Sequence, residues 1–211
     1  MADSQLKTGT TTLAIVCKDG VVVAADKRAT AGTMIAMTDV DKVIPVNSQM
    51  MLTIAGSVSD AQLLVKLIKA ETRLNQLRLG RQNTAKEVAN LIGGLVYNML
   101  RNSMGMSVTH FLFAAQNTNG TFEVYDIYPD GSVSLVKDFI SSGSGSVFAF
   151  GVLEAIYKKG LSIEDGVILA KRSISAAMAK DSATGNGADI YKLTKNGVEK
   201  VETLRVASTI M

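Results

Sequence analysis

The 211-residue chain has one histidine, one cysteine, two prolines and no tryptophan. A single histidine, His110, cannot build a zinc site from several histidines, and any Ser–His–Asp or Cys–His mechanism would depend on that one ring. A single cysteine, Cys17, cannot form an intramolecular disulfide, which fits a reducing compartment. If the chain is an enzyme, its general base is therefore expected to be a group other than histidine.

Long apolar runs and a strong net charge are also missing. The first residues lack the apolar run of a signal peptide, and no stretch of about 18 apolar residues could span a membrane. The 22 Lys and Arg residues exceed the 19 Asp and Glu residues by three, too small a surplus to indicate nucleic-acid binding. The sequence predicts a cytoplasmic protein that binds neither membrane nor nucleic acid.

What is present is a regular succession of β and α patterns. Strands are expected at 10–16, 21–25, 43–46 and 51–55, then helices from 59 to 80 and from 84 onward. Further strands are expected at 109–115, 122–127, 132–136 and 139–142, followed by helices at 148–157 and 162–179 and a hairpin over 189–201. No repeat or linker interrupts this order, so one domain is expected.

This order predicts the fold class. Short turns favour antiparallel sheets, and the helices come in sequential pairs. The continuous apolar run at 21–25 suits a strand that is buried on both sides. We therefore expect an α+β protein with four layers, an α/β/β/α sandwich of two antiparallel sheets flanked by helix pairs.

Single features give weaker signals. His110 lies in a strand pattern beside two phenylalanines and is expected to be a packed or surface residue, and Cys17 a small buried hydrophobe. The glycines at 143–145 indicate a tight loop before a helix, since no P-loop lysine follows. The oxygen-rich stretch 181–187 lacks an EF-hand register. Neither a metal nor a cofactor is expected.

The sequence also contains several short motifs. Each motif alone is weak evidence for a family, but the set in this order is highly specific. It runs Gly9-Thr10-Thr11-Thr12, then Ala24-Ala25-Asp26-Lys27-Arg28-Ala29-Thr30, Lys42, Ala55-Gly56, Gly143-Ser144-Gly145 and Asp181-Ser182-Ala183-Thr184-Gly185. In this order and spacing the chain resembles the archaeal-type 20S proteasome β subunits, which are N-terminal-nucleophile hydrolases. The resemblance extends from residue 9 to about residue 201.

The resemblance implies a division of the chain and a set of catalytic roles. Residues 1–9 correspond to a propeptide removed by autocatalysis between Gly9 and Thr10, and residues 10–211 to the peptidase domain. Thr10 corresponds to the nucleophile, and its freed α-amine to the base. The supporting catalytic residues are Asp26, Lys42, Ser144, Asp181 and Thr184, with Thr184 in the place of a family serine, and the backbone N–H of Gly56 corresponds to the oxyanion hole.

The resemblance also implies a substrate pocket. The corresponding positions are Ala29, Val40, Ile44, Ile54 and Val58, while Thr30 and Gly56 would hold the substrate backbone. Because none of the pocket side chains is charged, cleavage after apolar residues is expected. Alternatively, Ile44 and Ile54 narrow the pocket and favour small side chains.

The implied function is that of a threonine endopeptidase that degrades unfolded proteins inside a ring-shaped chamber. The implied partners are homo- or hetero-heptameric β rings stacked between α rings, and an ATPase unfoldase that docks on the α rings. A weakly active or non-catalytic structural β paralogue is the alternative, although the retained Gly9-Thr10, Asp26 and Lys42 favour an active subunit. A bacterial two-ring relative is disfavoured by the Ala-x-Asp-x-Arg pattern at 24–28.

Overall fold

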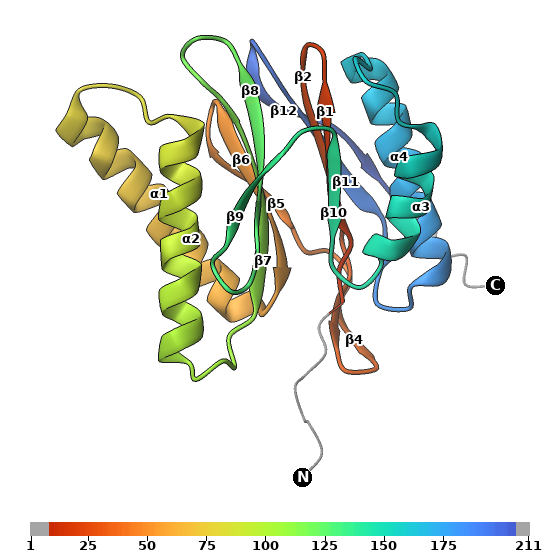
Figure 1. Ribbon diagram of the computed structural model, residues 1–211. Coiled ribbons are helices and arrows are strands. Elements are labelled where there is room, and N and C mark those ends of the chain that lie inside the picture. Colours follow the sequence, from red (N-terminus) through yellow and green to blue (C-terminus); the bar gives the residue numbers. More distant parts are fainter. Residues whose placement is uncertain (1–8, 206–211) are drawn as a thin grey trace.

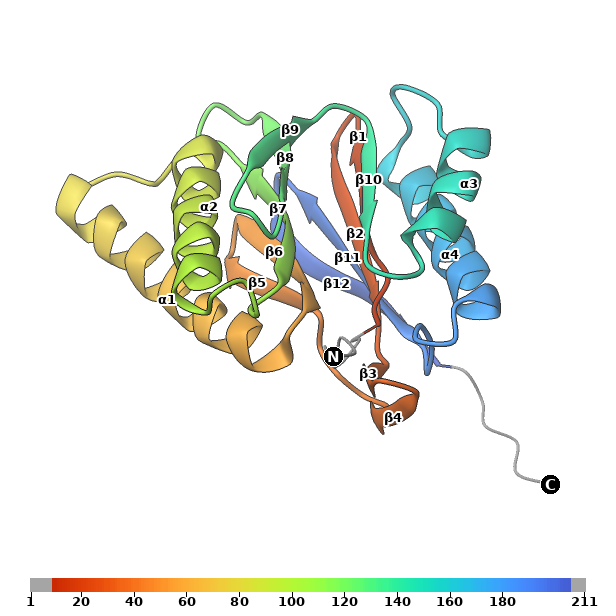
Figure 2. The same cartoon turned by 60° about the horizontal axis from the view of Figure 1, so that its bottom comes forward.

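The computed structural model describes residues 9–205, which form four layers, two antiparallel sheets between two helix pairs (Figures 1 and 2). One sheet has the order β10-β1-β2-β11-β12 and the other the order β5-β6-β7-β8-β9. The first consists of β10 (Phe139–Ser142), β1 (Thr12–Cys17), β2 (Gly20–Asp26), β11 (Ala188–Thr194) and β12 (Gly197–Leu204). The second consists of β5 (Val43–Asn47), β6 (Met50–Gly56), β7 (Thr109–Gln116), β8 (Phe122–Ile127) and β9 (Val133–Val136). The predicted α/β/β/α sandwich is confirmed.

Four helices are present where helical patterns were expected, and several of their ends coincide with capping residues. They are α1 (Val58–Leu79), α2 (Ala85–Asn102), α3 (Ser146–Ile156) and α4 (Ile163–Lys180). Gly80 ends α1 in the left-handed conformation, with φ of 64°, which glycine adopts at little cost. Thr84 and Glu87 form both bonds of a capping box at α2, and the Ser162 hydroxyl accepts the backbone N–H of Asp165 at the start of α4. None of the helices within residues 9–205 is long and apolar enough to cross a membrane.

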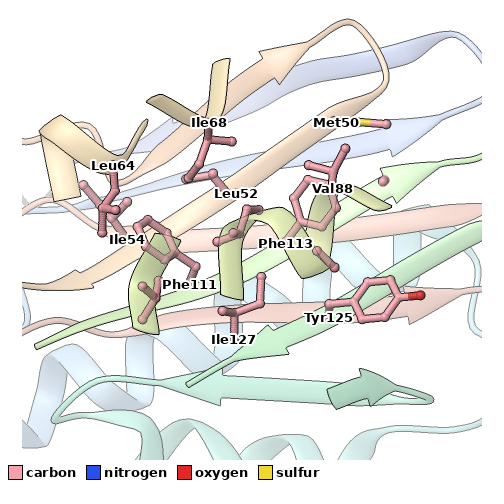
Figure 3. Packing of buried hydrophobic residues seen from close by; sticks show 14 of the residues in the cluster. Met50, Leu52, Ile54, Leu64, Ile68, Val88, Phe111, Phe113, Tyr125 and Ile127 are labelled. Atoms are coloured by element: carbon pink, nitrogen blue, oxygen red, sulfur yellow. The ribbon is translucent and has the colours of Figure 1, made fainter. Parts of the chain in front are cut away.

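Apolar side chains fill each of the three spaces between the layers. Figure 3 shows the cluster between α1, α2 and the β5–β9 sheet, where Phe111 and Phe113 are fully buried beneath Ile68. Along β1 the side chains alternate, because Leu13 faces α3 and α4 whereas Ala14 faces the other sheet. Strands β1 and β2 are thus covered on both sides, as the apolar run at 21–25 indicates.

Two parts of the structure differ from the sequence expectation. A small hairpin, β3 (Ala29–Ala31) and β4 (Met34–Met37), follows β2 and was not expected, because its strands are short and β4 is exposed along its whole length. The spacing of the apolar residues in α1 predicts one buried stripe, but Leu64 and Ile68 are buried whereas Leu63 and Leu77 are 50% and 64% exposed. Figure 1 shows the reason for Leu77, since the C-terminal end of α1 lies away from the sheet.

Candidate active site

The predicted site residues meet at one end of the sandwich, where β1 begins and the β3–β4 hairpin lies (Figure 2). Strands β1 and β2 and the loop after α4 bring Thr10, Asp26 and Asp181 from one sheet and its helices. The loop before β5 and the end of β6 bring Lys42 and Gly56 from the other sheet. The site therefore depends on the packing of the two sheets against each other.

The peptide bond between Gly9 and Thr10 is held in a close-fitting environment. The Thr10 hydroxyl donates a hydrogen bond to the Gly9 carbonyl oxygen over 2.6 Å, and the Gly9 N–H donates to the Thr30 hydroxyl over 2.8 Å. A Cβ atom added to Gly9 would lie 1.8 Å from the Cβ of Ala183, so glycine alone fits without movement. The hydroxyl of Thr10 thus lies beside the carbonyl of the residue that precedes it.

Asp26 is fully buried and accepts four hydrogen bonds. Its Oδ1 accepts the Thr11 N–H over 2.9 Å and the Lys42 ammonium over 2.7 Å, and its Oδ2 accepts the backbone N–H groups of Arg28 and Gly185 over 3.0 and 3.1 Å. Four donors satisfy a buried carboxylate and fix its orientation. Asp26 therefore acts on the site by holding Lys42 and the start of β1.

Lys42 is 4% exposed and also donates to the Arg28 carbonyl oxygen over 2.5 Å. Burial lowers the pKa of the Lys42 ammonium below its ordinary value, and the neighbouring Asp26 carboxylate opposes that effect without cancelling it. Lys42 is thus a buried amine beside Thr10 whose proton is held less tightly than that of a surface lysine.

A second polar cluster surrounds the nitrogen of Thr10. The Thr10 N–H donates to the Ser144 hydroxyl over 3.3 Å, and Ser144 in turn donates to Asp181 Oδ2 over 2.6 Å. The same Oδ2 accepts the Thr184 hydroxyl over 2.5 Å, and the hydroxyls of Thr184 and Thr11 lie 2.7 Å apart. Ser144 is the member that touches Thr10, whereas Asp181 and Thr184 act through it and through Thr11.

Arg28 positions this cluster, a role that we did not assign from the sequence. Its Nη1 donates to the Ser182 carbonyl oxygen and its Nε to the Asn186 side chain, each over 2.7 Å. A Cβ atom on Gly185 would lie 2.5 Å from the guanidinium, so the loop passes directly against it. The motif that contains Arg28 was the available signal, but the contacts join residues more than 150 positions apart.

A small pocket opens beside Thr10. The predicted residues that line it are Ala29, Thr30, Val40, Ile54, Gly56 and Val58, together with Gly9, Thr10 and Lys42. Ile44 is not among the lining residues and packs against the core beneath α1 and α2. Ala61 also lines the pocket but was not predicted to do so. It lies in the first turn of α1, where a buried alanine is indistinguishable in the sequence from an ordinary core residue of a helix.

Gly56 forms part of the wall of this pocket. Its φ is 106°, a conformation that favours glycine, and an added Cβ atom would lie 2.1 Å from the Val108 carbonyl oxygen. A residue with a side chain would therefore move the backbone at the position where the resemblance places the oxyanion hole.

Other sequence features lie outside the site. Cys17 is buried in the apolar layer next to α4, and burial raises the pKa of its thiol to about 12. Within residues 9–205, no group of three or more His, Cys, Asp or Glu side chains is arranged to hold a metal ion. Of the predicted propeptide, residues 1–8 lie outside the described residues.

Comparison with known proteins gives an independent result. Residues 6–193 match a family model described as "Proteasome subunit". A protein named "Proteasome subunit beta" from Ferroglobus placidus is 41% identical over 192 residues, which covers 89% of this chain and 87% of the relative. Proteins of the same name from Methanothrix thermoacetophila and Methanococcus aeolicus are 37% and 41% identical, covering 96% and 90% of this chain and 96% and 87% of the relatives.

Proposed function

The chain belongs to the proteasome subunit family, and from this premise we propose that it is a catalytic β subunit of the 20S core particle and a threonine endopeptidase. The family is a family of proteases, and membership implies assembly into a proteasome core particle. The observation that carries the catalytic part of the proposal is the position of Thr10. Its hydroxyl donates a hydrogen bond to the Gly9 carbonyl oxygen, and its N–H donates to Ser144, which in turn donates to Asp181.

We propose that the first reaction of the chain is its own cleavage. The Thr10 hydroxyl attacks the Gly9 carbonyl carbon, the Gly9–Thr10 amide breaks, and an ester forms while the nitrogen of Thr10 becomes a free amine. Water then hydrolyses the ester, leaving a carboxylate on Gly9 and a free N-terminal Thr10. The amide nitrogen of Thr10 is not basic before cleavage, so the proton of the Thr10 hydroxyl reaches that nitrogen only as the amide bond breaks. Burial lowers the pKa of Lys42, but its ammonium remains a donor to Asp26 and to the Arg28 carbonyl oxygen.

The freed amine then serves peptide hydrolysis. An α-amino group has a pKa of ~7.7–8.0, so that a substantial neutral fraction can accept the Thr10 hydroxyl proton near neutral pH. Ser144, which contacts this nitrogen before cleavage, orients it afterwards. The backbone N–H of Gly56 stabilises the oxyanion of the tetrahedral intermediate, a role whose loss typically costs ~2.7–4 kcal/mol.

The pocket supports a preference for apolar side chains at the residue before the cleaved bond. Its side chains next to Thr10 are Ala29, Val40, Ile54, Val58 and Ala61, with Lys42 the one charged lining residue. Lys42 is already bonded to Asp26 and so does not offer a free charge to an acidic substrate. A panel of fluorogenic peptides decides this point, since faster cleavage after arginine or glutamate than after apolar residues would overturn it.

The exposed leucines of α1 fit the assembly that the family implies. Leu63, Leu74 and Leu77 are between 37% and 64% exposed on one helix, which is an apolar surface suited to contacts between subunits. We propose heptameric β rings stacked between α rings, with an ATPase unfoldase that delivers unfolded substrates. A ring assembly hides an undiscriminating nucleophile from folded proteins by size exclusion.

The test of the proposed activity is Thr10→Ala. This variant is expected to assemble like the parent but to lose peptide hydrolysis, because the nucleophilic oxygen is removed. Thr10→Ser keeps a hydroxyl at the same place and serves as the control, with measurable hydrolysis expected. If parent and Thr10→Ala assemble and both lack activity, the chain is a structural β paralogue instead.

A further inference from the structure

His110 links two other polar side chains through both of its ring nitrogens. Its Nε2 is 2.5 Å from Oδ1 of Asp126, and its Nδ1 is 2.7 Å from the Ser142 hydroxyl. The ring also lies against Tyr128, with centroids 4.7 Å apart. His110 and Asp126 come from neighbouring strands of the β5–β9 sheet, while Ser142 ends β10 of the other sheet. The histidine therefore bridges the two sheets.

These three residues are the types of a catalytic triad, but their setting argues against a second nucleophile. Ser142 is 3% exposed and pairs with Thr12 of β1 inside the sheet. A substrate carbonyl could not reach its hydroxyl without separating the strands. The bridge is therefore a structural connection. Its effect on the active site depends on the residues that adjoin His110 and Ser142.

Both ends of the bridge adjoin the site around Thr10. On β7, His110 pairs with Ala55, the residue directly before Gly56. On β10, Ser142 directly precedes Gly143 and Ser144. The bridge thus spans from the strand beside the predicted oxyanion hole to the turn that contacts the Thr10 nitrogen.

The turn after Ser142 tolerates little displacement. Gly143 has φ of 90°, and a Cβ atom there would lie 2.0 Å from the Thr10 carbonyl oxygen. The Gly145 N–H approaches the same oxygen over 3.4 Å, and Ser144 contacts both the N–H of Thr10 and Asp181. A shift of β10 relative to β7 would therefore move Ser144, together with the Thr10 backbone that this turn contacts, relative to Gly56.

We propose that His110 is a positioning residue of the active site, which holds the Ser144 turn and the Gly56 strand in register by bonding Ser142 to Asp126 across the sandwich. This inference rests on the proposed peptidase function of Thr10. His110 touches neither substrate nor nucleophile, and it acts through the backbone that follows Ser142. Loss of the bridge is expected to lower the rate of the chemical step more than the binding of substrate.

The test uses variants that divide the bridge into its two halves. His110→Phe keeps a ring and removes both bonds, whereas His110→Asn can reach Ser142 from near the Nδ1 position and His110→Gln can reach Asp126 from near the Nε2 position. In the assembled, processed protein, His110→Phe is expected to lower kcat by about tenfold or more, with KM within about twofold of the parent, as a small misplacement of reacting groups does. His110→Asn should recover more of kcat than His110→Gln, because the bond to Ser142 is the one next to the turn.

Ser142→Ala and its combination with His110→Phe complete the test. Ser142→Ala should reproduce the fall in kcat, and the double variant should fall no further than His110→Phe alone, since both changes break one connection. Thr12→Val, opposite Ser142 on β1, is the matched control, because the Thr12 hydroxyl is buried and has no hydrogen-bond partner among the described residues. The proposal is overturned if Ser142→Ala keeps the parental kcat, if the effects are additive, or if His110→Asn and His110→Gln lose kcat equally and in proportion to thermal stability.

The outcome separates this inference from the proposed function. If Thr10→Ala retains hydrolysis, the proposed function fails whatever the His110 variants show. If Thr10→Ala is inactive while His110→Phe and Ser142→Ala match the parent, only the positioning role fails. If His110→Phe does not assemble, Ser142→Ala and His110→Asn still give the decisive comparison.

Discussion

At Thr184 a threonine stands where the resemblance indicates a serine, and its contacts show how the hydroxyl is used. The residue is 1% exposed, donates to Asp181, and shares a hydrogen bond with Thr11. The extra methyl group is accommodated in a buried position without loss of either contact. The departure from serine therefore leaves the support of the Thr10 nitrogen intact.

The hydroxyl of Thr184, and not its shape, is expected to matter for activity. Thr184→Val keeps the shape but leaves the buried Thr11 hydroxyl and the Asp181 carboxylate each without one partner, which typically costs ~1–3 kcal/mol per group. We expect a large fall in kcat for peptide hydrolysis and a lower thermal midpoint. Thr184→Ser keeps the hydroxyl and should stay within a few-fold of the parent. Equal activity of the valine and serine variants would contradict the role given to this hydroxyl.

At the scale of single elements, α2 carries two adjacent glycines in opposite environments. A Cβ atom on Gly93 would lie 2.6 Å from a methyl group of Val133 and 2.8 Å from the Gly131 carbonyl oxygen, whereas one on Gly94 would meet open space. The close approach of α2 to the loop before β9 therefore depends on Gly93. Gly94 has no such constraint.

The two alanine variants should move stability in opposite directions. Gly94→Ala is expected to stabilise α2 by about 0.5–1 kcal/mol, because alanine loses less backbone entropy than glycine in a helix. Gly93→Ala removes the same entropy cost but must displace Val133 or the neighbouring backbone, so a lower thermal midpoint is expected. Stabilisation of similar size by both changes would show that α2 and the loop do not approach as closely as described.

The start of α2 also gives a prediction about pH. Hydrogen bonds from Arg81 and from the Thr84 backbone N–H lower the pKa of Glu87 to about 2. The folded state thus favours the charged form, and the stabilisation is present above the ordinary glutamate pKa of ~4.3 and is lost as pH falls toward 2. Glu87 is exposed, so the effect is small. Thermal midpoints of the parent and Glu87→Gln should differ at pH 7 and approach each other as the pH falls from about 4 toward 2.

Local signals explain which elements could be predicted from the sequence. Gly80, Thr84 and Ser162 mark helix ends through contacts a few residues away, so the helices were predictable. The β3–β4 hairpin is short and exposed and has no apolar periodicity. His110 meets Asp126 through the pairing of β7 with β8, but it meets Ser142, 32 residues away, only through the packing of the two sheets, which no local pattern encodes.

At the scale of the whole molecule, the sandwich brings together residues that are far apart in the chain. Thr10, Lys42, Gly56 and Ser144 come from both sheets, and their order along the sequence, matched to a known family, indicated the site before any contact was known. Arg28 and Ala61 were not identified by that comparison, because their roles depend on contacts between segments that are distant in the sequence. The exposed leucines of α1 similarly appeared as one stripe in the sequence, and the structure separates the buried from the outward side.

The intact mass of the assembled protein decides whether Thr10 is an N-terminal nucleophile that the chain itself releases. The account predicts that the active parent begins at Thr10 and that peptide hydrolysis accompanies this shorter mass. The Thr10→Ala variant, prepared on its own, should retain residues 1–9. A parent that still begins at Met1 while hydrolysing peptides at full rate would contradict it, because the base would then have to be a group other than the freed amine of Thr10.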